Sequence, residues 1–208
     1  MPCKHKFIDE LELKGLDYAP ETLVVGTFNP AWPEENNAEW FYGRTQDSFV
    51  WNVLPALYGT PSLVNATAAE WRQFCRTQRI AFTDLITSID DADEHNRNHR
   101  KIISGFADKA LVYNFDDFVF TDIVRILKQH PSIRNVYITR GITESFWRHL
   151  WSPVMHYCNT NGLHERRLLP ASEESAYQHE AHNQHHPDAA IEALPDYVLY
   201  RWKLEWHC

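Results

Sequence analysis

Four short apolar segments alternate with helical segments along the chain, and this alternation limits the fold more than any other feature of the sequence. The first segment covers residues 22–28, where Leu23, Val24 and Val25 follow one another as in a strand buried on both faces of a parallel sheet. Gly26 then marks a turn. The other three expected strands cover residues 80–86, 135–140 and 167–171.

The connections between these strands are far longer than a hairpin loop and contain apolar residues at helical spacing. Helices are expected over residues 48–57, 67–78, 116–130 and 143–150, in a further segment ending at Asn161–Gly162, and in the tail from Pro187 onward. The segment 87–101 is expected to be a loop, and the histidine-rich segment 179–186 a solvated polar segment. The sequence therefore predicts an α/β fold, a three-layer α/β/α sandwich around a small, four-stranded, mainly parallel sheet.

Local signals mark several helix ends. Thr67 and Glu70 form a capping-box pattern, which predicts that a helix begins just after Thr67. Pro55 is expected to end or kink the first helix, and Pro153 to break the helical segment around it. Gly162 is expected to cap the end of the next helix.

Length and composition favour one domain spanning residues 1–208. A chain of 208 residues has the usual size of a single domain, and 44% of its residues are hydrophobic. The formal net charge of -8 argues against a protein that coats nucleic acid nonspecifically, but it is compatible with a local basic cleft. The four cysteines lack the spacing of a zinc site or an iron–sulfur cluster, so no metal cluster and no cofactor are expected.

The same sequence lacks targeting and membrane signals. No stretch approaches the roughly 18 apolar residues of a membrane helix, and the N-terminus lacks the apolar core of a signal peptide. A cytoplasmic protein that does not contact membranes is therefore expected.

The carboxyl ends of the four expected strands should meet at one edge of the sheet, where open α/β proteins bind their ligands. The loops after Phe28, Ile86, Thr139 and Ala171 are then expected to come together there. The segment 40–44, Trp-Phe-Tyr-Gly-Arg, adds aromatic rings for stacking, a glycine that lets a ligand come close to the backbone, and a positively charged arginine. This combination predicts a pocket for a flat ligand with polar edges.

Four segments share their residue types and their order with one known family. They are GTFNP at 26–30, FYGRTQDSFVW at 41–51, ITRG at 138–141 and LLPAS at 168–172. Together they resemble the uracil-DNA glycosylase superfamily, nearest its mismatch-specific uracil/thymine and deoxyinosine branch. Because each motif is short, their order over about residues 22–172 carries more weight than any one of them. The chain departs from this branch in the extra residue of GTFNP and in Asp47, where the family often has asparagine.

The resemblance implies an enzyme that flips a damaged base, uracil or hypoxanthine, out of DNA and hydrolyses its N-glycosidic bond without a metal. Asn29 and Asp47 are then the catalytic candidates, with Asn29 holding the attacking water. Phe28 or Tyr42 would stack on the base. The other implied contacts are Gly26 and Thr27 to the base, and Arg44, Arg140, Pro170, Ala171 and Ser172 to the DNA backbone.

Structural roles compete with these functional ones. Asn29 is also suited to a turn before Pro30, Tyr42 to core packing, and Arg140 to an exposed ion pair. Asp84 could cap the turn after the second strand or help to position water, with capping the first choice. Two other functions stay open: a noncatalytic member that binds nucleic acid or a nucleotide, and a small-molecule enzyme such as a nucleoside hydrolase.

Overall fold

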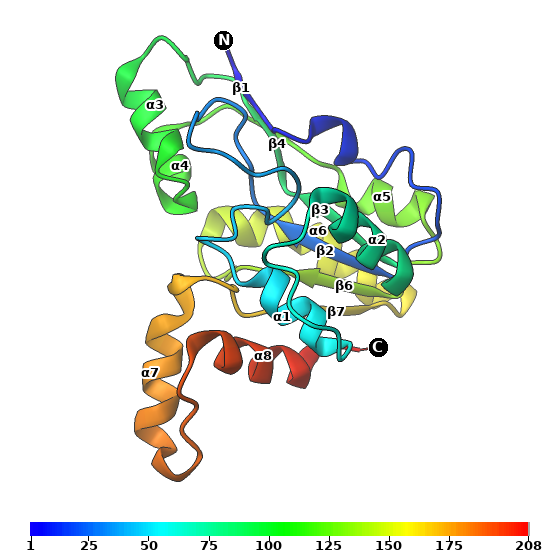
Figure 1. Ribbon diagram of the computed structural model, residues 1–208. Helices are drawn as coiled ribbons and strands as arrows, with labels where there is room; N and C mark the ends of the chain where they lie inside the picture. The colour runs from blue at the N-terminus through cyan, green and yellow to red at the C-terminus, as the bar shows by residue number, and fades with distance from the viewer. Residues whose placement is uncertain (208) are drawn as a thin grey trace.

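A four-stranded parallel sheet forms the centre of the computed structural model, which describes residues 1–207 (Figure 1). Its strands stand in the order β3 (Ile80–Asp84), β2 (Thr22–Gly26), β6 (Asn135–Ile138) and β7 (His164–Arg167). Every neighbouring pair is parallel, with Thr22 opposite both Ile80 and Asn135. The predicted fold class, an α/β protein with a four-stranded parallel sheet, is therefore confirmed.

The expected fourth strand, 167–171, is misplaced, because β7 begins at His164 and ends at Arg167. This edge strand has the polar sequence HERR, which gives no apolar signal. The apolar pair that suggested a strand lies just beyond it. Leu168 donates its N–H to Ile138 at 2.8 Å, and the Leu169 carbonyl accepts the indole N–H of Trp202 at 2.7 Å.

Helices cover both faces of the sheet, because successive side chains of a strand point to opposite faces. One layer contains α1 (Val50–Leu57), α2 (Ala68–Gln78) and α8 (Leu194–Glu205), and the other contains α5 (Ile123–Gln129) and α6 (Ser145–Asn161) (Figure 1). Val24 packs with the first layer and Val25, the next residue, with the second. The chain thus has the three layers of an α/β/α fold.

A second sheet, antiparallel and absent from the sequence prediction, lies beside the first. It has the strand order β1 (Cys3–Lys4), β4 (Ile86–Ile89) and β5 (Phe118–Phe120). The expected strand 80–86 is therefore two strands, and the expected helix 116–130 is wrong over its first residues. Asp122 caps α5 instead, accepting the N–H of Arg125 at 2.9 Å. These strands are too short for an alternating pattern to stand out.

Three further helices occupy polar or unassigned segments. They are α3 (Arg97–Ser104), α4 (Asp108–Asn114) and α7 (Ala176–His185), and short 3-10 helices lie at η1 (Ile8–Glu10), η2 (Glu173–Ser175) and η3 (Pro187–Ala189). The expected loop 87–101 is thus wrong at both ends. Asn96 begins α3 by accepting the N–H groups of Asn98 and His99. The histidine-rich segment is helical, and its Asn183 bonds the backbone of Ile191 in both directions at 2.9 Å.

The predicted caps at Thr67 and Gly162 are confirmed, whereas Asp116 and Asp117, the expected caps of the helix before Pro131, lie outside α5. Thr67 and Glu70 form the capping box of α2, and Gly162 ends α6 with φ 67°. The predicted break at Pro153 is wrong, because α6 continues through it to Asn161. Buried side chains on both sides of the proline hold the helix against the sheet, and this packing outweighs the lost backbone bond.

Pro55 likewise lies inside α1, which continues to Leu57. A proline cannot bond the carbonyl four residues before it, here that of Trp51. This carbonyl accepts the N–H of Leu63 at 2.8 Å instead, which explains why the helix tolerates the residue. No helix within residues 1–207 is long and apolar enough to cross a membrane.

Candidate active site

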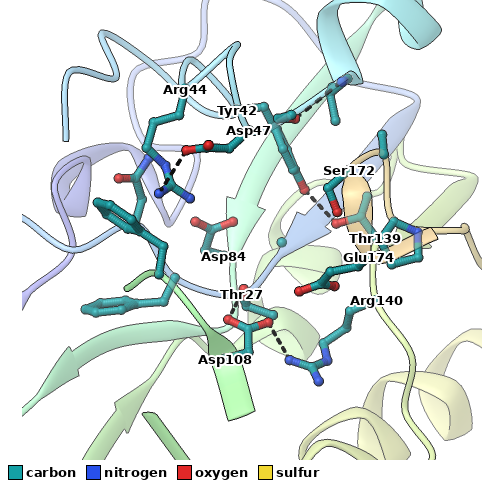
Figure 2. A pocket seen from close by; sticks show the side chains of 18 of the residues that line it. Thr27, Tyr42, Arg44, Asp47, Asp84, Asp108, Thr139, Arg140, Ser172 and Glu174 are labelled. Carbon is teal, nitrogen blue, oxygen red and sulfur yellow. Dashed lines mark hydrogen bonds and ion pairs between the residues drawn. The ribbon is translucent and has the colours of Figure 1, made fainter. Parts of the chain in front are cut away.

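A pocket of about 520 Å³ opens at the carboxyl ends of β2, β3 and β6 (Figure 2). The residues that the sequence predicts for the site all line it: Gly26, Thr27, Phe28, Asn29, Tyr42, Arg44, Asp47, Arg140, Pro170, Ala171 and Ser172. Other lining residues include Asp84, Phe106, Asp108, Thr139, Glu173 and Glu174. The fold therefore brings the predicted residues together, while the role of each stays a prediction.

Gly26 ends β2 at the floor of the pocket, where only a residue without a side chain fits. A Cβ atom there would lie 2.3 Å from Asp84 Oδ1 and 2.8 Å from the Tyr42 hydroxyl. Tyr42 adopts φ 54° and bonds Thr139 Oγ1 through its hydroxyl at 2.9 Å. Burial, with a smaller effect of Asp84, raises the pKa of Tyr42, so its hydroxyl stays protonated and can donate a hydrogen bond.

Asp84 ends β3 with its carboxylate in the pocket and only 6% of the residue exposed. His5 Nε2 lies 2.7 Å from Asp84 Oδ2, and His5 Nδ1 accepts the N–H of Phe7 at 2.9 Å. Because Nδ1 is an acceptor, the ring proton of a neutral His5 is on Nε2 and points at the carboxylate. Within residues 1–207, Asp84 Oδ1 has no hydrogen-bond donor and lies above Gly26.

Asn29 has a different environment, because its amide oxygen is engaged in the turn after β2. Asn36 Nδ2 donates to Asn29 Oδ1 at 2.5 Å and to the Pro30 carbonyl at 2.6 Å. The backbone carbonyl of Asn29 accepts the N–H of Lys6 at 2.7 Å. These contacts suit a residue that fixes the shape of the loop.

Asp108 joins three elements at another side of the pocket. It is the first residue of α4, and it accepts the Thr27 hydroxyl at 2.8 Å and Arg140 Nη1 at 2.5 Å. Arg140 follows β6, lies 3.6 Å above the Trp147 ring and has 14% of its side chain exposed. Burial raises the pKa of Asp108 to about 6, although Arg140 and Thr27 act in the opposite direction. Asp108 therefore ties α4 to the ends of β2 and β6.

Arg44 lies across the pocket against Phe106, which belongs to the loop between α3 and α4. Its guanidinium carbon is 3.5 Å from the centre of the Phe106 ring, and Phe106 adopts φ 50°. Arg44 Nη1 lies 3.5 Å from Asp47 Oδ2, whose side chain is 64% exposed. Asp47 thus lies at the mouth of the pocket, and Arg44 is partly neutralised by it.

The segment 170–174 forms the opposite rim. The Ala171 carbonyl accepts the N–H of Phe49 at 2.6 Å, and the Pro170 carbonyl accepts the Ser175 hydroxyl at 2.5 Å. Ser172 precedes the 3-10 helix η2, which begins with the two glutamates 173 and 174. This rim is therefore fixed to α1 and η2 and is acidic.

The charges of the pocket favour positive charge on a bound molecule. Five carboxylates line it, Asp47, Asp84, Asp108, Glu173 and Glu174, against two guanidinium groups, Arg44 and Arg140. Figure 2 shows the carboxylates of Asp84, Asp108 and Glu174 turned toward the same space. A carboxylate can orient a water molecule and stabilise a cationic sugar, while aromatic rings can hold a flat base. Within residues 1–207, no group of His, Cys, Asp and Glu side chains could hold a metal ion.

Comparison with known proteins gives a match in structure alone. No family model and no curated protein sequence matches the chain. The solution structure of a proposed uracil DNA glycosylase from Methanosarcina acetivorans superposes with a TM-score of 0.53 and 13% sequence identity, over 92% of this chain and 94% of that one. At this identity the likeness shows that the two proteins share a fold.

Proposed function

We propose that this protein is a DNA glycosylase, related to the mismatch-specific and deoxyinosine branch, which hydrolyses the N-glycosidic bond of a flipped uracil or hypoxanthine in DNA. The observation that carries the proposal is Asp84, a buried carboxylate that His5 orients at the floor of a partly aromatic pocket. The pocket lies at the carboxyl ends of parallel strands, where such folds bind ligands.

In this proposal Asp84 Oδ1 accepts a proton of the attacking water. The water oxygen bonds to C1′ of the sugar as the bond between C1′ and the base nitrogen breaks, and the electrons of that bond leave with the base. The carboxylates around the pocket stabilise the cationic character of the sugar during this step. The water proton passes to Asp84, and the departing base regains a proton from solvent.

The flipped base lies in this proposal between the aromatic side chains of the pocket. Phe28 replaces the base stacking lost from DNA, which leaves Tyr42 to contact an edge of the base. The Tyr42 hydroxyl, kept protonated, accepts the hydroxyl proton of Thr139 and donates its own to a carbonyl oxygen of the base, which both uracil and hypoxanthine possess. Gly26 and Thr27, at the floor of the pocket, allow the base to come close to the backbone.

The two catalytic candidates predicted from the sequence take secondary roles in this proposal. Asn29 holds the loop and contributes its remaining amide hydrogen-bonding capacity to the water, because Asn36 occupies its oxygen. Asp47 is exposed and paired with Arg44, so it guides the sugar at the mouth of the pocket. Arg44, Arg140 and the segment 170–172 contact the DNA backbone on either side.

An excision assay tests the proposal. Single- and double-stranded oligonucleotides with one uracil or one hypoxanthine are incubated with the protein, and alkaline cleavage then reveals abasic sites. We expect abasic sites from at least one substrate and none with an Asp84→Asn preparation, which controls for contaminating glycosylases. Absence of cleavage on every substrate would refute the proposal.

A nucleoside hydrolase is the second candidate, and the acidic lining of the pocket favours it. Five carboxylates around a small cavity suit the hydroxyl groups of a free ribose better than a phosphate-bearing strand. Release of free base from uridine or inosine, without cleavage of the oligonucleotides, would identify this activity in place of the first.

A further inference from the structure

One face of α3 carries three cations. Arg97, Arg100 and Lys101 have the spacing i, i+3 and i+4, which places them together on one side of the helix. The opposite side carries Ile102 and Ile103, which pack into the core. All three cations are exposed, and within residues 1–207 none of them forms an ion pair.

This positive face stands out against the overall formal net charge of -8. Like charges at these spacings repel each other and destabilise a helix. Some arginines elsewhere on the surface pair with carboxylates, as Arg72, Arg76 and Arg79 do around α2, whereas isolated cations such as Arg134 form no ion pair within residues 1–207. The face of α3 therefore carries three grouped cations without an ion-pair partner among residues 1–207, which suits an anionic partner outside the chain.

The position of this face relates it to the pocket. The helix α3 ends at Ser104, and the next two residues, Gly105 and Phe106, line the pocket. Lys109, also exposed and outside any ion pair of the described residues, follows Asp108, which anchors α4 to the strand ends. In Figure 1, α3 and α4 stand at the upper left of the molecule, whereas α7, which directly follows η2 (Glu173–Ser175), extends at the lower left.

We propose that the α3 face, formed by Arg97, Arg100 and Lys101, with Lys109 beside it, binds the phosphate backbone of the nucleic-acid strand whose base enters the pocket. The inference rests on the proposed function and adds the side from which the strand approaches. Arg97 and Lys101 are separated by about 6 Å along the helix axis, which is close to two nucleotide rises of about 3.4 Å. Glu173 and Glu174 of the opposite rim repel phosphates, so contact with the strand on that side is limited to residues 170–172.

Salt-dependent binding tests the inference directly. The variant Arg97→Glu/Arg100→Glu/Lys101→Glu is compared with Lys128→Glu/Arg134→Glu/Lys203→Glu, which changes the net charge equally at exposed cations that do not line the pocket. Fluorescence anisotropy of an undamaged single-stranded oligonucleotide gives the affinity of each protein across a range of salt concentrations. Circular dichroism melting confirms that both variants fold.

We expect the α3 variant to lose about two units of the slope of log affinity against log salt, because each phosphate contact on a single strand contributes about 0.7. Over a change from about 50 to 200 mM salt this corresponds to roughly a 20-fold change in affinity. The control variant should keep the wild-type slope. An unchanged slope in the α3 variant, or an equal loss in both variants, would overturn the inference.

The excision assay separates this result from the proposed function. If binding depends on the α3 face but no base is released, the binding surface stands and the glycosylase activity is wrong. If bases are released at the wild-type rate by the α3 variant with an unchanged slope, the activity stands and the binding surface is wrong. If an unfolded variant prevents the measurement, the single substitution Arg100→Ala should still lower the slope by about 0.7, and an unchanged slope would again refute the surface.

Discussion

Two carboxylates on the pocket, Asp84 and Asp108, are held in contrasting ways. Asp84 is held through one oxygen by a histidine whose other nitrogen accepts a backbone N–H, and its second oxygen has no donor within residues 1–207. Asp108 has both oxygens engaged, one by the Thr27 hydroxyl and one by the Arg140 guanidinium. The first arrangement leaves an acceptor for a water molecule, while the second uses the whole carboxylate to join parts of the protein.

This difference distinguishes a carboxylate suited to catalysis from a carboxylate suited to a structural role within one pocket. A residue that activates water must keep a lone pair directed at the reacting atoms. A residue that connects elements gains from having every acceptor satisfied, because an unpaired buried polar atom is costly. We therefore expect substitutions at Asp84 to affect activity most and substitutions at Asp108 to affect mainly stability.

The largest expected effect is that of Asp84→Asn. The amide keeps the size of the side chain but is a poor proton acceptor, so the excision rate under single-turnover conditions should fall by about 10²- to 10⁴-fold. Asp47→Asn is the matched control at the mouth of the pocket and should change the rate only a few-fold. A larger loss in Asp47→Asn than in Asp84→Asn would transfer the water-activating role to Asp47.

Gly26→Ala should have the next largest effect. Its methyl group would lie 2.3 Å from Asp84 Oδ1, so the carboxylate must move, and a displacement of about 1 Å in an active site can lower the rate about 10²-fold. Gly141→Ala provides the control, because among the described residues no atom beyond its chain neighbours lies within 4 Å of the added Cβ. Rates measured alongside thermal melting distinguish a displaced carboxylate from a protein that fails to fold. A wild-type rate in Gly26→Ala would show that Asp84 is not close to the reaction.

The fold could be predicted largely because the central strands are apolar and the helices between them are amphipathic. Leu23, Val24 and Val25 give a clear signal since both faces of their strand are buried. The edge strand β7 and the small antiparallel sheet give little signal, because His164–Arg167 is polar and the other strands have few residues. Their pairing is decided by partners distant in the sequence.

The site could be predicted in part for the same reason. Strand ends converge in a parallel sheet, so residues after β2 and β6 were expected to meet. His5 and Asp108 carry no such signal, since His5 reaches Asp84 across 79 residues and Asp108 begins a short helix in an unassigned segment. Of these three residues, only Asp84 has a local signal in the sequence, because it lies near the end of the second expected strand.

His5 tests whether the orientation of Asp84 matters apart from its burial. His5→Leu removes the hydrogen-bond donor and leaves a buried acceptor unpaired, so the free energy of unfolding should fall by about 1–3 kcal/mol or more, and the excision rate should fall too. His5→Gln restores a donor and should recover much of the rate. Urea denaturation and single-turnover assays on both variants check this. Equal rates in the two variants would show that His5 only fills space.

Asp108→Asn should have the smallest effect on activity and a characteristic effect on stability. The amide oxygen can still accept the N–H of Arg140, and the Thr27 hydroxyl can turn to accept the amide N–H, so the excision rate should change less than tenfold. The folded-state pKa of Asp108, about 6, lies above the ordinary value of 3.8, so between these values the folded protein keeps a proton that the unfolded chain has lost. The stability of the wild type relative to Asp108→Asn should therefore fall by about 2 kcal/mol as the pH rises from about 4 to 6, and stay level above that. Urea denaturation at a series of pH values measures this difference, and a difference that rises with pH would mean that Arg140 outweighs burial and that the Asp108 carboxylate is stabilised by its ion pair.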